Sequence, residues 1–258
     1  MSEIAIRGRT LAYEAQPATF DPSAVTIVFV HGSGGDRDDW RGQLDGVADA
    51  VNTVAVELPG HGRSEPPGET SVEAYTRWVT DLIEALGLRQ VMLVGNSLGG
   101  AIALRLAVDP PDWLKAIGIV GSGARLKVMP AVLEGLKTEP EKTLEMFSDF
   151  AVSPFAPEDV RNAVVEKFRK GSAVTIHGDL SACNDFDIMD RLRGITVPTW
   201  IIVGEDDRLT PVKYAEFLHE RIAGSTLVKV PGAGHLVMAE NATDFNRHLL
   251  NFIGGLAR

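Results

Sequence analysis

The sequence contains a single cysteine, Cys183, among 258 residues. One thiol excludes an internal disulfide and any metal site built from several cysteines. No apolar run approaches the ~20 residues that a membrane-spanning helix requires. The opening residues, MSEIAIRGRTLAYEA, lack a basic stretch followed by an apolar one, so they do not predict a secretory signal peptide. These absences favour a cytoplasmic protein that has no membrane partner.

Positive charge is also in short supply. Lysine and arginine together number 25, against 35 aspartates and glutamates, which gives a net charge of −10. This balance disfavours nucleic acid and anionic membranes as partners. The sequence has no P-loop, no dinucleotide-binding glycine pattern and no cluster of metal ligands. We therefore expect neither a metal nor a cofactor, and the oligomeric state, monomer or homodimer, is left open.

Short β-branched runs alternate with helical patterns along most of the chain. Residues 3–15 alternate around Gly8 and predict an opening β-hairpin. Six further strands are expected at 25–30, 52–58, 90–95, 115–121, 198–204 and 225–232. Helical patterns occur at 71–87, 98–109, 212–224 and 241–256. This alternation predicts an α/β fold with a doubly wound, mostly parallel eight-stranded sheet.

Residues 122–195 interrupt the alternation because they contain no convincing strand. Amphipathic patterns at 130–152 and 157–171 predict helices there instead. An insertion of this size after the sixth strand predicts a helical cap over the carboxyl edge of the sheet, where open α/β folds bind ligands. The expected organisation is a core domain formed by 1–121 and 196–258, with 122–195 as the cap.

The stretch VMLVGNSLGGAIAL places Ser97 between two glycines, after a strand pattern and before a helix pattern. Gly95-Asn96-Ser97-Leu98-Gly99 matches the G-x-S-x-G nucleophile elbow. In that motif the serine sits on a strained, sharp turn, and the residues two before and two after it must be small because the helix passes close by. The context favours a nucleophile over a serine that merely occupies a turn.

A nucleophilic serine needs a base, and the base needs an orienting carboxylate. His235 lies in a glycine-rich loop after the last predicted strand, which places it at the same sheet edge as Ser97. His31 and His61 precede the serine and are interpreted as residues that organise loops through hydrogen bonds. The helical positions of His219 and His248 favour surface or packing roles for them, and His177 has no assigned role.

The carboxylate candidates follow another predicted strand, in the sequence IIVGEDDRLTP. Glu205, Asp206 and Asp207 all have suitable chemistry, and three adjacent acids also fit a solvated loop. Any of them gives the chain order serine, acid, histidine, which is the order of an α/β-hydrolase triad. Three such residues, each after a strand and in that order, predict a catalytic triad.

Other motifs strengthen this prediction: VHGSGGDRDDW, VELPGHGRSEPP, VGEDDRLTP and VPGAGHLVMAE. With them the chain resembles the α/β-hydrolase superfamily over nearly its whole length, as a serine carboxylesterase-like member with a helical cap. The resemblance implies Asp207 as the acid, because the family pattern Gly-x-x-Asp-x-x-x-Pro runs from Gly204 to Pro211. It also implies an oxyanion hole formed by the backbone amides of Ser33 and Leu98, with Gly34 as the alternative to Ser33.

A Ser-His-Asp triad predicts acyl transfer, and the expected function is hydrolysis of small-to-medium carboxylic esters. Gly32, Gly34 and Leu236 are substrate-binding candidates beside the triad, and Met129 and Leu133 are candidates in the cap. The apolar stripes of the cap also fit simple packing against the core. Cys183 is interpreted as a small buried residue of the cap, with nothing to place it near the triad.

The chain is also similar to carbon–carbon hydrolases that act on meta-cleavage products. It departs from their pattern at Gly35-Asp36, where they usually have Pro-Gly, and at Leu236, where tryptophan is common. Arg125 or Arg191 could still bind a substrate carboxylate in such an enzyme. A thioesterase or acyltransferase with the same triad is a further alternative. A non-catalytic ligand sensor is the remaining alternative, and the complete triad argues against it.

Overall fold

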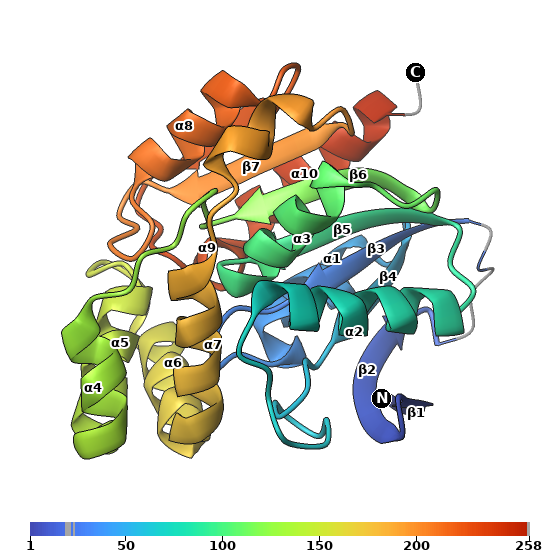
Figure 1. Cartoon of the computed structure of the whole chain (residues 1–258). Helices are drawn as coiled ribbons and strands as arrows, with labels where there is room; N and C mark the ends of the chain where they lie inside the picture. Colours follow the sequence, from blue (N-terminus) through green and yellow to red (C-terminus); the bar gives the residue numbers. More distant parts are fainter. Residues whose placement is uncertain (19–21, 23, 257–258) are drawn as a thin grey trace.

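The computed structural model describes residues 1–18, 22 and 24–256. An eight-stranded sheet forms its centre, with the strand order β1-β2-β4-β3-β5-β6-β7-β8. The β1–β2 and β2–β4 pairs are antiparallel, and all other strand pairs are parallel. The predicted doubly wound, mostly parallel sheet is therefore confirmed (Figure 1). The strands are β1 (Ser2–Ile6), β2 (Arg9–Gln16), β3 (Val25–Val30), β4 (Asn52–Val56), β5 (Gln90–Asn96), β6 (Leu114–Val120), β7 (Thr199–Gly204) and β8 (Thr226–Val230).

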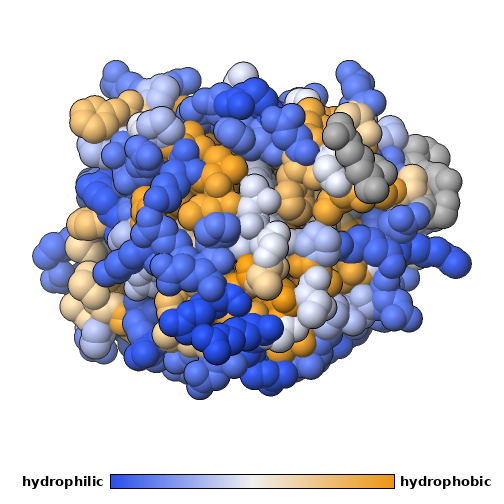
Figure 2. Space-filling model, turned by 90° about the horizontal axis from the view of Figure 1, so that it is seen from above, coloured by the Kyte–Doolittle hydropathy of each residue, from blue (hydrophilic) through white to orange (hydrophobic). Residues whose placement is uncertain are grey.

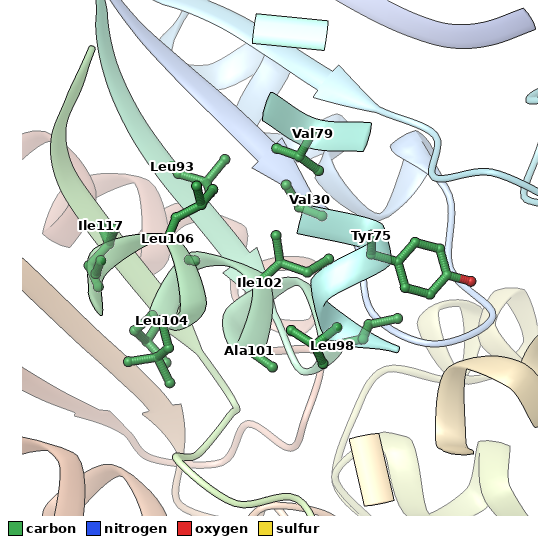
Figure 3. Close-up of a cluster of buried hydrophobic side chains, with 14 of the residues drawn as sticks. Val30, Tyr75, Val79, Leu93, Leu98, Ala101, Ile102, Leu104, Leu106 and Ile117 are labelled. Carbon is green, nitrogen blue, oxygen red and sulfur yellow. The ribbon is translucent and has the colours of Figure 1, made fainter. Parts of the chain in front are cut away.

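Helices cover both faces of the sheet, which explains why the central strands are apolar on both sides. α2, α3 and α8 share one apolar cluster with the sheet, and α1 and α10 share the other. Figure 3 shows Ile102 of α3 in one cluster with Val30 and Leu93 of the strands and Val79 of α2. These helices are α1 (Arg41–Val47), α2 (Val72–Ala85), α3 (Leu98–Val108), α8 (Val212–Arg221) and α10 (Ala242–Leu256), with the shorter η1 (Arg37–Trp40) and α9 (Val237–Glu240) beside them.

Helical elements occupy the stretch between β6 and β7, as predicted. They are α4 (Pro130–Thr138), α5 (Pro140–Ala151), α6 (Glu158–Lys170), α7 (Ala173–Asp185) and η2 (Met189–Gly194). The only β pairing among residues 122–195 is an isolated bridge between Arg125 and Asp187. Figure 1 shows α4 to α7 gathered at one end of the sheet. We call residues 122–195 the helical segment; its separation from a core domain stays a prediction.

The surface of the protein is largely hydrophilic on the face shown in Figure 2, where smaller apolar patches lie between polar residues. Over the described ranges, no helix is both long and apolar enough to pass through a bilayer. The parallel strands β3 to β8 end at one common edge, and the loops that leave this edge carry the predicted catalytic residues. The fold therefore brings those residues to the same side as α4 to α7.

Candidate active site

Ser97 forms the turn between β5 and α3. Its backbone has φ 52° and ψ −111°, a conformation that costs energy in a residue with a side chain. A Cβ on Gly95 would lie 2.0 Å from the carbonyl carbon of Gly99, and a Cβ on Gly99 would lie 2.3 Å from the carbonyl oxygen of Val30. Both glycines are therefore required by the close packing of the helix on the strands, which is the geometry of a nucleophile elbow.

His235 and Asp207 meet on the loops that follow β8 and β7. The two side chains are almost fully buried, and Nδ1 of His235 lies 2.9 Å from Oδ2 of Asp207. Since Nδ1–H donates to this carboxylate, Nε2 is the ring nitrogen available to a serine hydroxyl. Ser97 and His235 line the same small hollow. The structure thus brings the three predicted triad residues together at one sheet edge.

Asp207 is the acid that contacts the histidine, whereas its neighbours do not. Its Oδ1 accepts the backbone N–H groups of Leu209 and Thr210 at 2.9 and 2.8 Å. Burial alone would raise the pKa of Asp207, but the nearby His235 and these hydrogen bonds outweigh burial and lower it. Glu205 is exposed, and Asp206 accepts a hydrogen bond from the Ser153 hydroxyl at 2.8 Å.

Two polar side chains that the sequence did not single out hold the catalytic loops in place. The Asn96 side-chain amide donates to the carbonyls of Val120 and His235, at 3.2 and 3.1 Å, and so connects the elbow to the histidine loop. The Glu240 carboxylate accepts the N–H groups of Gly234 and Leu236, at 2.9 and 3.1 Å, on either side of the histidine. Such fixed supports preorganise a catalytic group.

Glu240 also joins this loop to the helical segment. The same carboxylate accepts the backbone N–H of Ser153, just after α5, at 2.8 Å. The guanidinium of Arg208, the residue after Asp207, donates to the carbonyl of Val152 at 3.0 Å and to that of Asp149. The end of α5 is therefore attached to the histidine loop and to the acid loop at the same time.

The loop after β3 carries Ser33, whose amide is the predicted oxyanion donor. A Cβ on Gly32 would lie 3.2 Å from Cβ of Ser97, so this loop packs directly against the nucleophile. The Gly34 amide donates to Asp179 at 3.1 Å, which removes the alternative donor. The Ser33 amide has no acceptor among the described residues. Leu98 begins α3, so its N–H has no partner within the helix. Two unsatisfied amides therefore flank Ser97.

Ser97 faces two compartments of very different size. A cavity of ≈ 330 Å³ extends from it beneath α4, α5 and α7, and its lining is mostly apolar. The hollow that contains His235, Gly32, Ser33 and Leu236 measures only ≈ 20 Å³. The large cavity is lined by Ser97, Leu126, Lys127, Val128, Met129, Val132, Met146, Phe147, Phe150, Leu180, Cys183, Arg208, Leu209, Thr210 and Tyr214.

Comparison with known proteins matches this architecture to a family. Residues 27–248 match the model of the alpha/beta hydrolase family. The chain belongs to this family. A solved structure described as a thermophilic esterase has 34% sequence identity and a TM-score of 0.85, over 99% of this chain and 97% of the other.

Two curated relatives of this hydrolase act in other ways. One, from Cupriavidus necator, is the dihydrolipoyllysine-residue acetyltransferase component of an acetoin cleaving system. It is 30% identical over 90% of this chain, which spans only 64% of that protein's length. The other is a 2-hydroxy-6-oxononadienedioate/2-hydroxy-6-oxononatrienedioate hydrolase from a Pseudomonas species. It is 27% identical over 88% of this chain and 87% of its own.

The hydrolase places three of the five substrate-binding candidates at the compartments. Met129 lines the large cavity, and Gly32 and Leu236 line the small hollow. Leu133 does not line the cavity and packs against the apolar cluster beneath it, because Val132, one helical turn from Met129, takes the cavity-facing position. Gly34 borders neither compartment, since its amide is turned toward Asp179.

Cys183 corrects a further interpretation. It is buried in α7, as predicted, but it lines the large cavity together with Ser97. Its sulfur lies 3.9 Å from the Ser33 hydroxyl. Burial raises the pKa of this thiol to about 12, so it remains protonated at neutral pH and acts as a small apolar wall.

The histidines of the loops after β3 and β4 organise those loops through hydrogen bonds, as predicted. Nε2 of His31 accepts the N–H of Leu58 at 3.0 Å, so its Nδ1–H donates to the Gly32 carbonyl at 2.7 Å. Burial and the adjacent His61 lower the pKa of His31 to about 3, which keeps the ring neutral. This neutral ring ties the loop after β4 to the loop that carries Ser33.

A buried carboxylate from the helical segment binds residues of both of these loops. Asp179 of α7 is 0% exposed and accepts from His61 Nε2 at 2.9 Å and from the Tyr75 hydroxyl at 2.5 Å, in addition to Gly34. Figure 3 shows the Tyr75 hydroxyl directed away from the apolar cluster around α3. Burial opposes a charge on His61, but the carboxylate outweighs burial and raises the pKa of this histidine.

We expect Asp179→Asn to remove a pH-dependent part of the stability. A histidine whose pKa is raised on folding stabilises fully below its unfolded value of about 6.5, and that contribution is lost as pH rises through the folded pKa. The variant should lose roughly 2 kcal/mol below pH 6.5, the value of hydrogen bonds to a buried charge. Urea unfolding at pH 6 to 9 measures this, with Asp244→Asn on the surface as the control. Parallel pH profiles for the wild type and Asp179→Asn would contradict it.

Proposed function

We propose that this hydrolase is a serine carboxylesterase that cleaves small-to-medium carboxylic esters with Ser97, His235 and Asp207. The observation that carries the proposal is the buried 2.9 Å His235–Asp207 pair beside a serine held in a strained elbow. The resemblance to a thermophilic esterase supports the same reaction class. In this proposal, residues 122–195 serve as the cap that encloses the acyl group.

The proposed reaction runs through an acyl-enzyme. His235 takes the Ser97 proton as the serine oxygen attacks the ester carbonyl, and the Ser33 and Leu98 amides donate to the oxyanion. The tetrahedral intermediate collapses, the carbon–alkoxy bond breaks, and the alcohol leaves with the proton from His235. Water, deprotonated by the same histidine, then attacks the acyl carbonyl, and Ser97 regains its proton as the acid departs.

We assign the alcohol half of the ester to the small hollow and the acyl half to the large cavity. The departing alcohol receives its proton from His235, so it must lie on the side of the small hollow that this histidine lines. A space of ≈ 20 Å³ is close to the smallest that holds a single water molecule. The acyl group then occupies the ≈ 330 Å³ cavity, which falls in the size range of small-ligand sites. Esters with a small alcohol and a longer acid fit best.

This assignment is tested with two isomeric esters, methyl octanoate and heptyl acetate, which differ only in which half is long. We expect kcat/KM for methyl octanoate to exceed that for heptyl acetate by about tenfold or more, since a one-water hollow cannot take a heptyl chain. Acid release is followed in a pH-stat. Equal rates for the two isomers would contradict the assignment of the compartments, and the absence of turnover of either would contradict esterase activity and favour a ligand sensor.

Carbon–carbon hydrolysis is the second candidate, because of the relative from Pseudomonas. The arginines considered for a dienone carboxylate do not reach the Ser97 cavity. Arg125 lies beside it and is 3.6 Å from Asp187, and Arg191 is 3.6 Å from Asp109. A vinylogous dienone acid in the same assay decides between the two reactions. Faster cleavage of this compound than of methyl octanoate would favour the carbon–carbon hydrolase.

The acetyltransferase relative supports a third candidate reaction class, acyl transfer. The proposed triad would attack a thioester carbonyl in the same way. An octanoyl thioester of a thiol with a long side chain, added to the same panel, separates thioesterase from esterase activity. We expect the methyl ester to be the better substrate, because the hollow at His235 is too small for a thiol with a long side chain.

A further inference from the structure

We propose that the acyl group bound by this hydrolase ends in an anion, held by Lys127 and Lys213 at the far end of the large cavity. This inference rests on the proposed esterase function and specifies its substrate class. The substrate would be an ester of a small alcohol with an acid whose apolar chain carries a carboxylate or a phosphate at its other end.

A second groove adjoins the large cavity. This groove measures ≈ 380 Å³ and shares Lys127 and Tyr214 with the cavity. Its other lining residues are Ala124, Arg125, Met189, Lys213 and Phe217. A chain that extends from Ser97 through the cavity therefore arrives at Lys127 and then at Lys213, which follows the start of α8.

The charge along this path is entirely positive. No aspartate or glutamate lines either compartment, although the chain carries ten more acidic than basic residues. Of the cations, Arg125 is paired with Asp187, and Arg208 is occupied by backbone carbonyls near the end of α5. Arg125 therefore has a carboxylate partner, and Arg208 has two carbonyls and the Phe150 ring, whereas each lysine has a single neutral partner.

Neither lysine has a carboxylate partner in the described part of the chain. Nζ of Lys127 donates to the backbone carbonyl of Asn184 at 2.6 Å, and Nζ of Lys213 lies 6.0 Å from the centre of the Tyr214 ring. An ammonium group retains two further donors after one such bond, and it accepts carboxylate or phosphate equally as a point charge. The pair is thus a cationic end to an otherwise apolar path.

On the opposite side of Ser97, a lysine is neutralised by carboxylate partners. Lys167 borders the small hollow, but it is 2.8 Å from Asp36 and also pairs with Asp39. The alcohol side therefore offers no unpaired charge. Only the acyl side combines an apolar wall with uncommitted ammonium groups, so the anion is assigned to the acid and not to the alcohol.

The test compares methyl octanoate with monomethyl octanedioate, which has the same chain length and a terminal carboxylate. We expect kcat/KM for the acid-ended ester to be about tenfold higher in the wild type, a gain equal to one good charge-assisted hydrogen bond. In Lys127→Met/Lys213→Met this preference should fall to within about twofold of unity, because the acid-ended ester loses far more kcat/KM than methyl octanoate does. An ester that ends in phosphate distinguishes the two anions, and 0.5 M salt should weaken either preference.

Lys137→Met provides the matched control, since this lysine is exposed on α4 and does not line the cavity. It should leave the preference unchanged. A wild type that hydrolyses both esters equally, or a preference that survives loss of both lysines, would overturn the inference while leaving the esterase proposal intact. If neither ester is hydrolysed, the proposed function itself fails.

Discussion

Replacing Ser97 by alanine is expected to lower kcat by about 10⁶, to the detection limit of a pH-stat assay with methyl octanoate. In the proposed mechanism the hydroxyl forms the acyl-enzyme, and we expect no neighbouring side chain to take its place. Cys183, which also lines the cavity, keeps its proton because burial raises its pKa to about 12. Loss of the hydroxyl therefore leaves only binding and the oxyanion amides.

The fold should survive this change. Alanine at 97 must adopt the same positive φ, and the Ser97 carbonyl that accepts from the Ser122 hydroxyl at 2.7 Å is retained. Circular dichroism and the melting temperature serve as controls. A fluorophosphonate should add one label to the wild type and none to Ser97→Ala. Full activity or labelling of the variant would show that another residue is the nucleophile.

Asp207→Asn is expected to lower kcat by about 10⁴ with little change in KM. Because the Oδ1 position accepts two backbone N–H groups, an asparagine keeps its oxygen there and presents its N–H₂ group to Nδ1 of His235. This favours the tautomer with the proton on Nε2, which cannot accept the serine proton. The change also removes the negative charge that stabilises the imidazolium formed during attack. Steady-state kinetics with methyl octanoate measure the loss.

Asp206→Asn is the matched control, because this neighbouring acid contacts Ser153 instead of the histidine. We expect it to retain activity within a few-fold. The acid limb of stability provides a second readout for Asp207. Its pKa is lowered on folding, so its charge stabilises the fold above about pH 4, and this contribution is lost as pH falls through the folded pKa. Equal activity losses in both variants would contradict the assignment of Asp207.

The sheet was predictable because its information is local. Each central strand is a short β-branched run, and β3 spans the predicted residues 25–30 without a shift. The glycines around Ser97 also carry a local signal, since each is demanded by a backbone contact within the elbow. α7 was missed because it is buried on several sides and mixes Asp179 with apolar residues, so it shows no amphipathic period.

The supports of the site were not predictable, because their partners are remote in sequence. Asp179 meets Gly34 across 145 positions, and Asn96 meets the carbonyl of His235 across 139. Nothing near these residues distinguishes them from ordinary surface polar groups. The error on Leu133 has a different origin: spacing showed that α4 has an apolar stripe, but only packing decides which members face the cavity.

The attachment at the end of α5 has a mechanical consequence for how a substrate enters. The Glu240 carboxylate accepts the N–H group of Ser153, just after α5, and those of the two residues beside His235. We therefore expect α5, which covers the cavity, to move together with the proposed catalytic base. An outward hinge motion of α5 would displace His235 from its proposed catalytic position, and activity would be lost. We therefore expect substrate and product to pass between side chains at the rim of the cavity, such as the exposed Met129 and Phe150. The proposed catalytic groups would keep their positions during this passage.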